Sequence, residues 1–426
     1  MLNFATHRLP NGLTLLVHED HNTPLATVNL LYNVGARDEE PHRTGFAHLF
    51  EHLMFGGTKA VPSYDEVVDS LGGENNAFTN NDYTNYYLTF PAEHLERALW
   101  LEADRMRGLN FSQRSLEVQR QVVTEEYHQR YLGQPYGDVW LLLRPLAYRE
   151  HPYRWNTIGA DIRHVQEASL EEVEAFFGRY YRPDNCILAV AGNVKDSEVL
   201  ELTEKHFGRV EGGGWKVELP RISTLHSPLS TLPAEPPQRE PRRLRVERPV
   251  PHSALYLAFH MPGRLDEGYY ACDLLTDILA NGNSSRLYLS LVKELRLFTE
   301  IQAYITGDFD PGLLVVSGKL HPGVEPERAE EALWQELEQL RQQPAPQQEL
   351  LKVQNKQEAT FLFSQYKAAD RALGLCYYQW IGRPEWVNDE PLNYRRVTPE
   401  ALQAEARRVF RPENCSTLIY AKAQLR

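Results

Sequence analysis

The most constraining feature of this sequence is an internal repeat. Residues 169–186, SLEEVEAFFGRYYRPDNC, match residues 398–415, TPEALQAEARRVFRPENC, at a constant offset. Each copy has a hydroxyl residue suited to cap a helix, a helical pattern, an Arg-Pro turn and an apolar run typical of a strand. A weaker match in the same order pairs residues 48–57 with residues 273–282. The repeat predicts two copies of one architecture, each about 210 residues long.

A proline- and arginine-rich stretch separates the two copies. It begins with Gly212-Gly213-Gly214 and carries prolines at 220, 228, 233, 236, 237 and 241, a composition that resists helices and central strands. We therefore predict an N-terminal catalytic domain over residues 1–215, a linker over 216–248 and a homologous, non-catalytic domain over 249–426.

Hydrophobic patterns in the first copy mix strands with helices. Residues 9–19 predict a strand pair entered by a Pro-Asn-Gly turn, and 26–34 and 83–90 predict further strands. Helical patterns cover about 43–55, 63–71, 92–107 and 113–131. This mixed order predicts α+β domains built on largely antiparallel sheets. No glycine-rich phosphate loop follows a strand, so nucleotide chemistry is not indicated.

Composition excludes several classes of protein. With 42% hydrophobic and 24% charged residues the chain is typical of a globular protein, and its net charge of −13 disfavours nucleic acid and anionic membranes as partners. No apolar stretch approaches the roughly 18 residues of a membrane span. The four cysteines form no CxxC pair and predict a reducing compartment. We expect a cytoplasmic protein.

The segment Gly45-Phe46-Ala47-His48-Leu49-Phe50-Glu51-His52 carries the most specific chemistry. On a helix, His48 and His52 project from one face and both imidazoles can bind one ion. Glu51 shares that face, where it can reach a water molecule without binding the metal itself. The order His-x-x-Glu-His is the inverted metalloprotease motif. The alternative is that both histidines are polar residues of an amphipathic helix, although the apolar neighbours indicate burial, and buried histidines need partners.

Together these motifs resemble the pitrilysin-type (M16, inverzincin) zinc metallopeptidases in their short two-domain form, similar to the zinc subunit of the mitochondrial processing peptidase. The resemblance implies two α+β halves that face each other as a clam-shell chamber around an unfolded peptide, with one Zn²⁺ per chain. The residues that carry the resemblance are Gly45 to Thr58, Leu71 to Thr79, Asp82, Thr84 and Val122-Val123-Thr124-Glu125-Glu126.

The resemblance places the third metal ligand on a downstream helix. The family pattern falls on Glu126, and Glu125 is the rival. The two side chains point about 100° apart on a helix, so only one of them can face the metal. Many relatives carry a second glutamate seven residues before the ligand, where this chain has Gln119.

The resemblance also implies a mechanism and a mode of substrate binding. Glu51 would be the general base for a zinc-activated water that attacks a peptide carbonyl, and would then protonate the leaving amine. Asn76, Ala77 and Phe78 would belong to an edge strand that accepts the substrate backbone as an added strand. The alternative is an interior strand without a binding role. Unfolded peptides are therefore the expected substrates.

The second copy lacks the histidine motif, because Asp273, Thr276 and Asp277 stand at its three positions. Relatives that complete the site from this half carry an arginine and a tyrosine where this chain has Val292 and Thr299. The resemblance therefore implies a heterodimer in which a paralogous subunit supplies that pair, although a homodimer or a slow monomer remains an alternative. A non-catalytic structural or adaptor member of the same fold is the alternative function.

Overall fold

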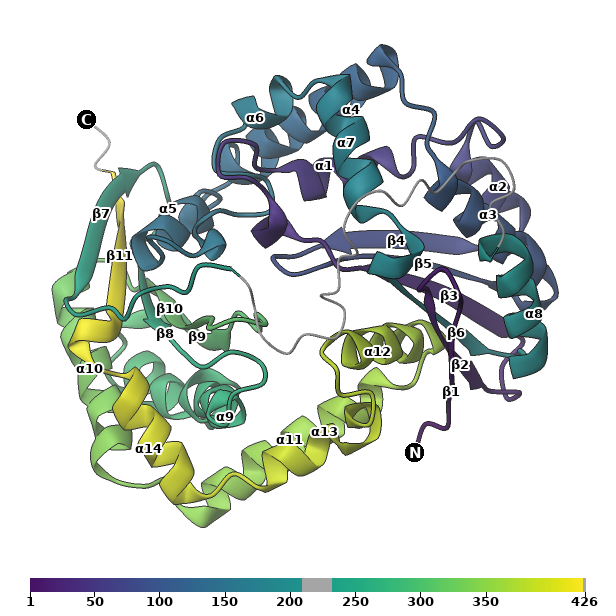
Figure 1. Ribbon diagram of the computed structural model, residues 1–426. Coiled ribbons are helices and arrows are strands. Elements are labelled where there is room, and N and C mark those ends of the chain that lie inside the picture. The colour runs from purple at the N-terminus through teal and green to yellow at the C-terminus, as the bar shows by residue number, and fades with distance from the viewer. Residues whose placement is uncertain (209–231, 424–426) are drawn as a thin grey trace. The chain divides into compact units, whose positions relative to one another are not determined.

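The computed structural model describes residues 1–208 and 232–423. It divides into two compact units (Figure 1). Unit 1 comprises Met1–Tyr127, Trp155–Ser230 and Leu362–Asp389, and unit 2 comprises His128–Arg154, Thr231–Phe361 and Glu390–Arg426.

The described residues form two sheets and their covering helices. The strands are β1 Ala5–Arg8, β2 Thr14–Glu19, β3 Leu25–Tyr32, β4 Glu74–Thr79, β5 Thr84–Pro91, β6 Cys186–Gly192, β7 Arg242–Arg248, β8 Ala254–His260, β9 Phe298–Ile305, β10 Leu313–Leu320 and β11 Cys415–Lys422. The α-helices are α1 Phe46–Leu53, α2 Tyr64–Ser70, α3 Leu95–Arg107, α4 Gln113–Tyr127, α5 Val139–Ala147, α6 Arg163–Gln166, α7 Leu170–Tyr180, α8 Asp196–Phe207, α9 Tyr269–Ala280, α10 Pro326–Gln342, α11 Gln347–Ser364, α12 Ala368–Trp380, α13 Trp386–Arg395 and α14 Pro399–Val409.

The two sheets repeat one topology. The strand order is β1-β2-β6-β3-β5-β4 in unit 1 and β7-β11-β8-β10-β9 in unit 2, so the second sheet reproduces the first without β1. β2 runs parallel to β6 and β7 runs parallel to β11, whereas the other neighbouring pairs are antiparallel. The predicted fold class, two homologous α+β units with largely antiparallel sheets, is confirmed.

Two asparagines explain why the repeated segment is so similar in both copies. The Asn185 side-chain amide donates to the Tyr180 carbonyl at 2.9 Å, and the Asn414 amide donates to the Val409 carbonyl at 2.9 Å. Each therefore satisfies a carbonyl at the end of its helix, α7 or α14, and leads the chain into the strand that follows. Ser169 caps α7 and Thr398 caps α14 in the same way.

The two sequence copies exchange one helix each. The apolar side of α5, which belongs to the first sequence copy, lies in a core with residues of β8, β10 and β11 in unit 2. Helix α12, from the second copy, packs on β3 and β6 of unit 1, where the Cys376 thiol lies 3.4 Å from the Ile187 carbonyl oxygen. Each compact unit is thus assembled from both sequence copies. The predicted boundaries 1–215 and 249–426 describe the repeat in the sequence, and as domain boundaries they remain a prediction.

The end of the predicted linker is a strand. Residues 242–248 form β7 at the edge of the second sheet, where Leu244 and Val246 pack on the core and Arg243 and Arg245 lie on the opposite, exposed side. Arg243 and Arg245 pair with Glu330 and Glu327 at 2.6 and 2.8 Å. The linker prediction is wrong for residues 242–248. Partly buried and exposed residues alternate along this segment, as in a strand, and this alternation decides the structure in spite of the high arginine content. Linker residues 216–231 lie outside the described residues.

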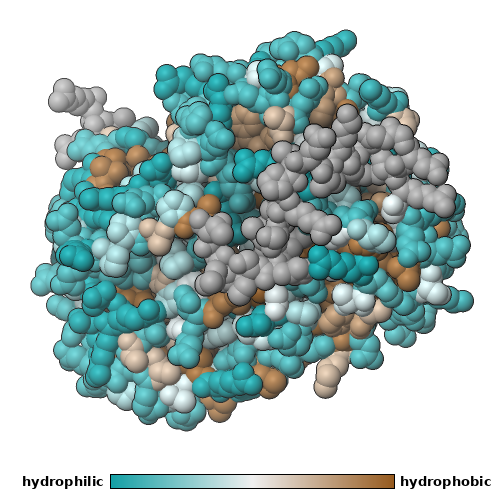
Figure 2. Space-filling model, in the orientation of Figure 1, coloured by the Kyte–Doolittle hydropathy of each residue, from teal (hydrophilic) through white to brown (hydrophobic). Residues whose placement is uncertain are grey.

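The helices of the described part follow the predicted pattern closely. α1, α2 and α3 lie within the predicted ranges, and α4 ends at Tyr127 and continues as a π-helical turn, His128–Leu132. None of the described helices is both long and apolar enough to cross a bilayer. On the face shown in Figure 2, hydrophobic residues form small groups among hydrophilic ones.

Candidate metal centre

Helix α1 carries the histidine motif on its less buried side. Leu49, Phe50 and Leu53 are buried, and the Phe50 ring stacks on Phe176 with centroids 4.9 Å apart. With the apolar side fixed in this way, His48, Glu51 and His52 are left partly exposed on the other side.

An unusual cap holds the start of α1. Gly45 precedes the helix with φ near +90°, and a Cβ there would lie 2.9 Å from the Ile158 carbonyl oxygen, so glycine is required. Because glycine has no side chain to cap the helix, the Glu39 carboxylate accepts from the Gly45 and Ala47 amides at 2.9 and 2.8 Å. Burial raises the pKa of Glu39 to about 8. The two amide donors act in the opposite direction but do not compensate for the effect of burial. No local pattern in the sequence indicates this role of Glu39, since its spacing from Gly45 matches no known cap motif.

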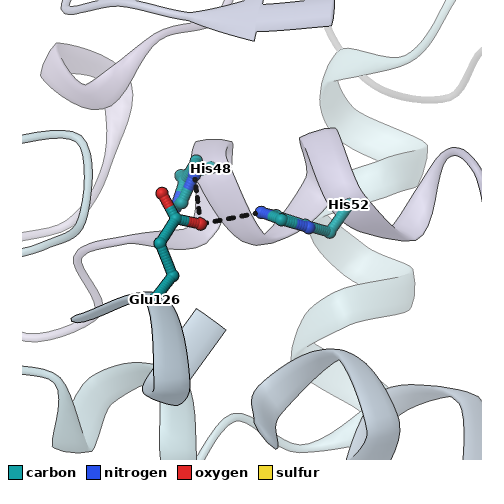
Figure 3. Close-up of side chains that lie close together, drawn as sticks. All are labelled: His48, His52 and Glu126. Atoms are coloured by element: carbon teal, nitrogen blue, oxygen red, sulfur yellow. Dashed lines mark ion pairs between the residues drawn. The ribbon is translucent and has the colours of Figure 1, made fainter. Parts of the chain in front are cut away.

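The structure brings His48, His52 and Glu126 together (Figure 3). The Glu126 Oε2 atom lies 3.5 Å from His48 Nε2 and 3.3 Å from His52 Nε2. Glu126 reaches the histidines from the last turn of α4, which packs against α1. Glu125, the rival residue, is exposed and does not belong to the cluster.

This donor set fits a zinc ion. Zinc–ligand distances of about 2.0–2.1 Å and tetrahedral angles place two ligand atoms about 3.3–3.4 Å apart, close to both distances from Glu126. The three potential ligand atoms all lie within 4.8 Å of one another. Among the residues that the structure describes, this is the one cluster of three or more such side chains.

Glu51 lies beside the cluster, on the side of β4. Thr79 is the neighbour on β4 whose side chain and backbone act on the Glu51 carboxylate and lower its pKa. Burial raises the pKa of Glu51 above its ordinary value and the Glu126 charge raises it further, whereas Thr79 and His52 lower it. Thr79 ends β4 and is a contact that the sequence analysis did not identify, although it lies inside a quoted motif.

β4 is the edge strand of the first sheet, and it carries Asn76, Ala77 and Phe78. The Ala77 amide donates to the Asn76 side-chain oxygen at 2.8 Å. Because backbone amides alternate in direction along a strand, the Ala77 and Thr79 amides point to the same side, away from β5. The open edge of β4 therefore faces Glu51. The binding role of these residues remains a prediction.

Comparison with known proteins agrees with this arrangement. Residues 14–145 match the family model described as insulinase (peptidase family M16), and residues 167–357 match the model of the peptidase M16 inactive domain. The chain is 30% identical over 368 residues to the zinc protease PqqE of Helicobacter pylori, covering 85% of this chain and 80% of that protein. It is 27% identical over 310 residues to the uncharacterized zinc protease YmxG of Bacillus subtilis, covering 72% and 71%.

Solved structures share the fold over the whole chain. The crystal structure of a protease from Helicobacter pylori matches with a TM-score of 0.89 and 27% identity, covering both chains completely. A peptidase M16 inactive domain from Pseudomonas fluorescens matches with a TM-score of 0.86 at 18% identity, covering 100% of this chain and 99% of that one.

The duplicated α+β unit, with a His-x-x-Glu-His helix beside a helix that carries Glu126, defines the class of pitrilysin-like proteins. Within that class, the chain belongs to peptidase family M16.

Proposed function

We propose that this protein is a zinc-dependent endopeptidase that cleaves unfolded peptides held in an extended conformation. The observation that carries the proposal is the position of Glu126 Oε2, which lies within 3.5 Å of the Nε2 atoms of both His48 and His52. His48, His52 and Glu126 would hold one Zn²⁺ per chain. The ion would supply Lewis-acid polarisation of a carbonyl oxygen and would make water more acidic.

Glu51 would move the proton. Its raised pKa brings it closer to the range in which a carboxylate can accept a proton from the attacking water and return it to the leaving nitrogen. Thr79, which lies beside the Glu51 carboxylate and lowers its pKa, would favour the ionised form that accepts the proton.

A substrate strand would add to the open edge of β4. The Ala77 amide would exchange its bond to the Asn76 side chain for a bond to a substrate carbonyl, so the added strand would pass in front of Glu51. Backbone recognition of this kind favours an extended conformation over a particular sequence. Folded proteins would be poor substrates.

Replacing Glu51 by glutamine tests the proposal. We expect Glu51→Gln to lower the rate of cleavage of an unstructured peptide by about 10²–10⁴-fold, because it removes the general base. Zinc content, measured by elemental analysis, should stay at one ion per chain. An unchanged rate would exclude Glu51 as the base, and a wild-type protein without zinc would favour the alternative, a structural or adaptor role.

We also propose that the chain is the zinc-bearing subunit of a heterodimer. Val292 lies in a π-helical segment and Thr299 in β9, the edge strand of the second sheet, and neither side chain can supply the arginine or tyrosine of complete relatives. Removing oxyanion donors typically costs about 10²–10³-fold in rate. We expect a paralogous subunit to raise kcat/KM by a similar factor. Full activity of the chain alone would contradict this proposal, and activity in a symmetric dimer would support the homodimer.

The location remains a proposal as well. The four cysteines are buried and unpaired, in keeping with a reducing compartment, and we infer that the protein acts in the cytoplasm. Fractionation of cells, followed by immunoblotting, would test this.

A further inference from the structure

A pocket of about 280 Å³ opens in unit 1 beyond the end of α1. Its wall combines residues that follow α1, the loop before α4 and the first turns of α4. The side chains that shape it are Leu53, Leu109, Phe111, Val118 and Gln119. A cavity of about 150 Å³ can hold a benzene ring, so this pocket has room for a large amino-acid side chain.

The chemistry of the wall favours an apolar guest. The polar groups of Ser112 and Ser115 are satisfied by each other, since the two hydroxyls lie 3.0 Å apart and the Ser115 amide donates to the Ser112 hydroxyl at 3.0 Å. No carboxylate belongs to the described residues that line the pocket, although the chain as a whole has a net charge of −13. Arg114 lines it as well and disfavours a cationic guest.

The pocket and the candidate metal centre share two elements, α1 and α4. Leu53 directly follows His52 in α1, and Gln119 lies seven residues before Glu126 on the same face of α4. Val118 and Val122, which are 48% and 42% exposed, form an apolar stripe beside that face. Seven helical residues span about 10.5 Å, which is about three residues of an extended peptide.

We propose that this pocket is a specificity subsite that binds a large apolar side chain of the substrate, about three residues from the scissile bond. The inference rests on the proposed peptidase function and deepens it. It makes recognition depend on one side chain as well as on the extended backbone. Leucine, methionine and phenylalanine should be favoured at that position, and lysine and arginine disfavoured.

The test uses one peptide in which each position around the scissile bond is changed in turn to alanine, leucine, phenylalanine or lysine. Binding to the Glu51→Gln variant is measured by fluorescence anisotropy, and cleavage by the wild type is measured as kcat/KM. We expect leucine or phenylalanine to be preferred over alanine by about tenfold or more at one position, as burial of a large apolar side chain predicts.

Two variants place a charge in the subsite. Val118→Glu adds a carboxylate at the exposed rim, and Gln119→Glu adds one inside the pocket with almost no change in shape. Each should reduce the apolar preference to less than about threefold and favour lysine at the same position, without changing the preferences elsewhere. Leu351→Glu is the control, because Leu351 is 43% exposed on α11 in unit 2.

Two results would overturn the inference: the absence of any preferred position, or a preference that both variants leave unchanged. Failure of every peptide to bind would overturn it too. If peptides bind with the expected preference and the wild type does not cleave them, the peptidase function fails while the subsite stands.

Discussion

At the scale of single residues, the candidate metal centre depends on which of two adjacent glutamates faces the histidines. The helical rotation of about 100° per residue separates Glu125 from Glu126. Contact between α4 and α1 turns Glu126 inwards, where its side chain is 16% exposed, whereas Glu125 belongs to the exposed residues of α4. The two residues therefore offer a matched pair of substitutions.

We predict that Glu126→Gln weakens zinc binding by at least about 100-fold, since changes to groups that merely support a ligand already cost 10–100-fold. Glu125→Gln should bind zinc as the wild type does. Competition with a chromophoric chelator measures both affinities. Equal losses in the two variants would contradict the assignment of Glu126 as the ligand.

At the scale of elements, α9 shows which contacts stand in the second copy where the first copy has the candidate metal centre. Asp277, the counterpart of His52, is buried, and its carboxylate accepts from Lys356 at 3.0 Å and from Gln357 at 2.8 Å. Both donors lie on α11, the counterpart of α4. The Lys356 ammonium group thus supplies the positive charge beside α9. The buried Asp277 carboxylate is paired by this charge without a metal ion.

A contact of Glu235 fixes the part of the predicted linker that precedes β7. The Glu235 carboxylate accepts from three consecutive backbone amides, those of Arg149, Glu150 and His151, at 2.9–3.0 Å. Burial acts to raise the pKa of Glu235, but the three amide donors outweigh it and the pKa lies below its ordinary value. Ionised Glu235 therefore stabilises the fold above the ordinary carboxyl pKa, and this contribution is lost as the pH falls through the lowered pKa.

We predict that Glu235→Gln lowers the free energy of unfolding by about 2 kcal/mol at pH 7, because hydrogen bonds to a charged group are lost. The difference from the wild type should shrink as the pH falls below the ordinary carboxyl range. Urea denaturation at several pH values measures it, and the exposed Glu240→Gln serves as control. A difference that does not depend on pH would show that the charge of Glu235 is unimportant.

At the scale of the whole molecule, the exchange of α5 and α12 makes each sequence copy incomplete. Without α12, the apolar surface of β3 and β6 would lose its covering helix, and without α5 the core of the second sheet would lose Val139, Leu143 and Ala147. Exposed apolar area of this kind costs about 25 cal/mol per Å².

We predict that residues 1–215 and 232–426, the second of which keeps Glu235 and β7, do not fold to a native state when produced separately, whereas the two fragments produced together do. Circular dichroism and hydrogen exchange of the amides follow folding in each sample. Independent folding of either fragment would contradict the view that the exchanged helices are required.

The sequence alone determined the features that depend on local spacing. The repeat follows from the match of two segments at a constant offset. The positions of α1 to α4 and the placement of His48, Glu51 and His52 on one helical face follow from a period of 3.6 residues. Tertiary structure decided the rest: Glu126 instead of Glu125 beside the histidines, Thr79 and Glu39 around α1, β7 in place of linker, and the exchange of α5 and α12. These outcomes depend on which surfaces bury each other across long separations in the chain, and a local pattern carries no information about that choice.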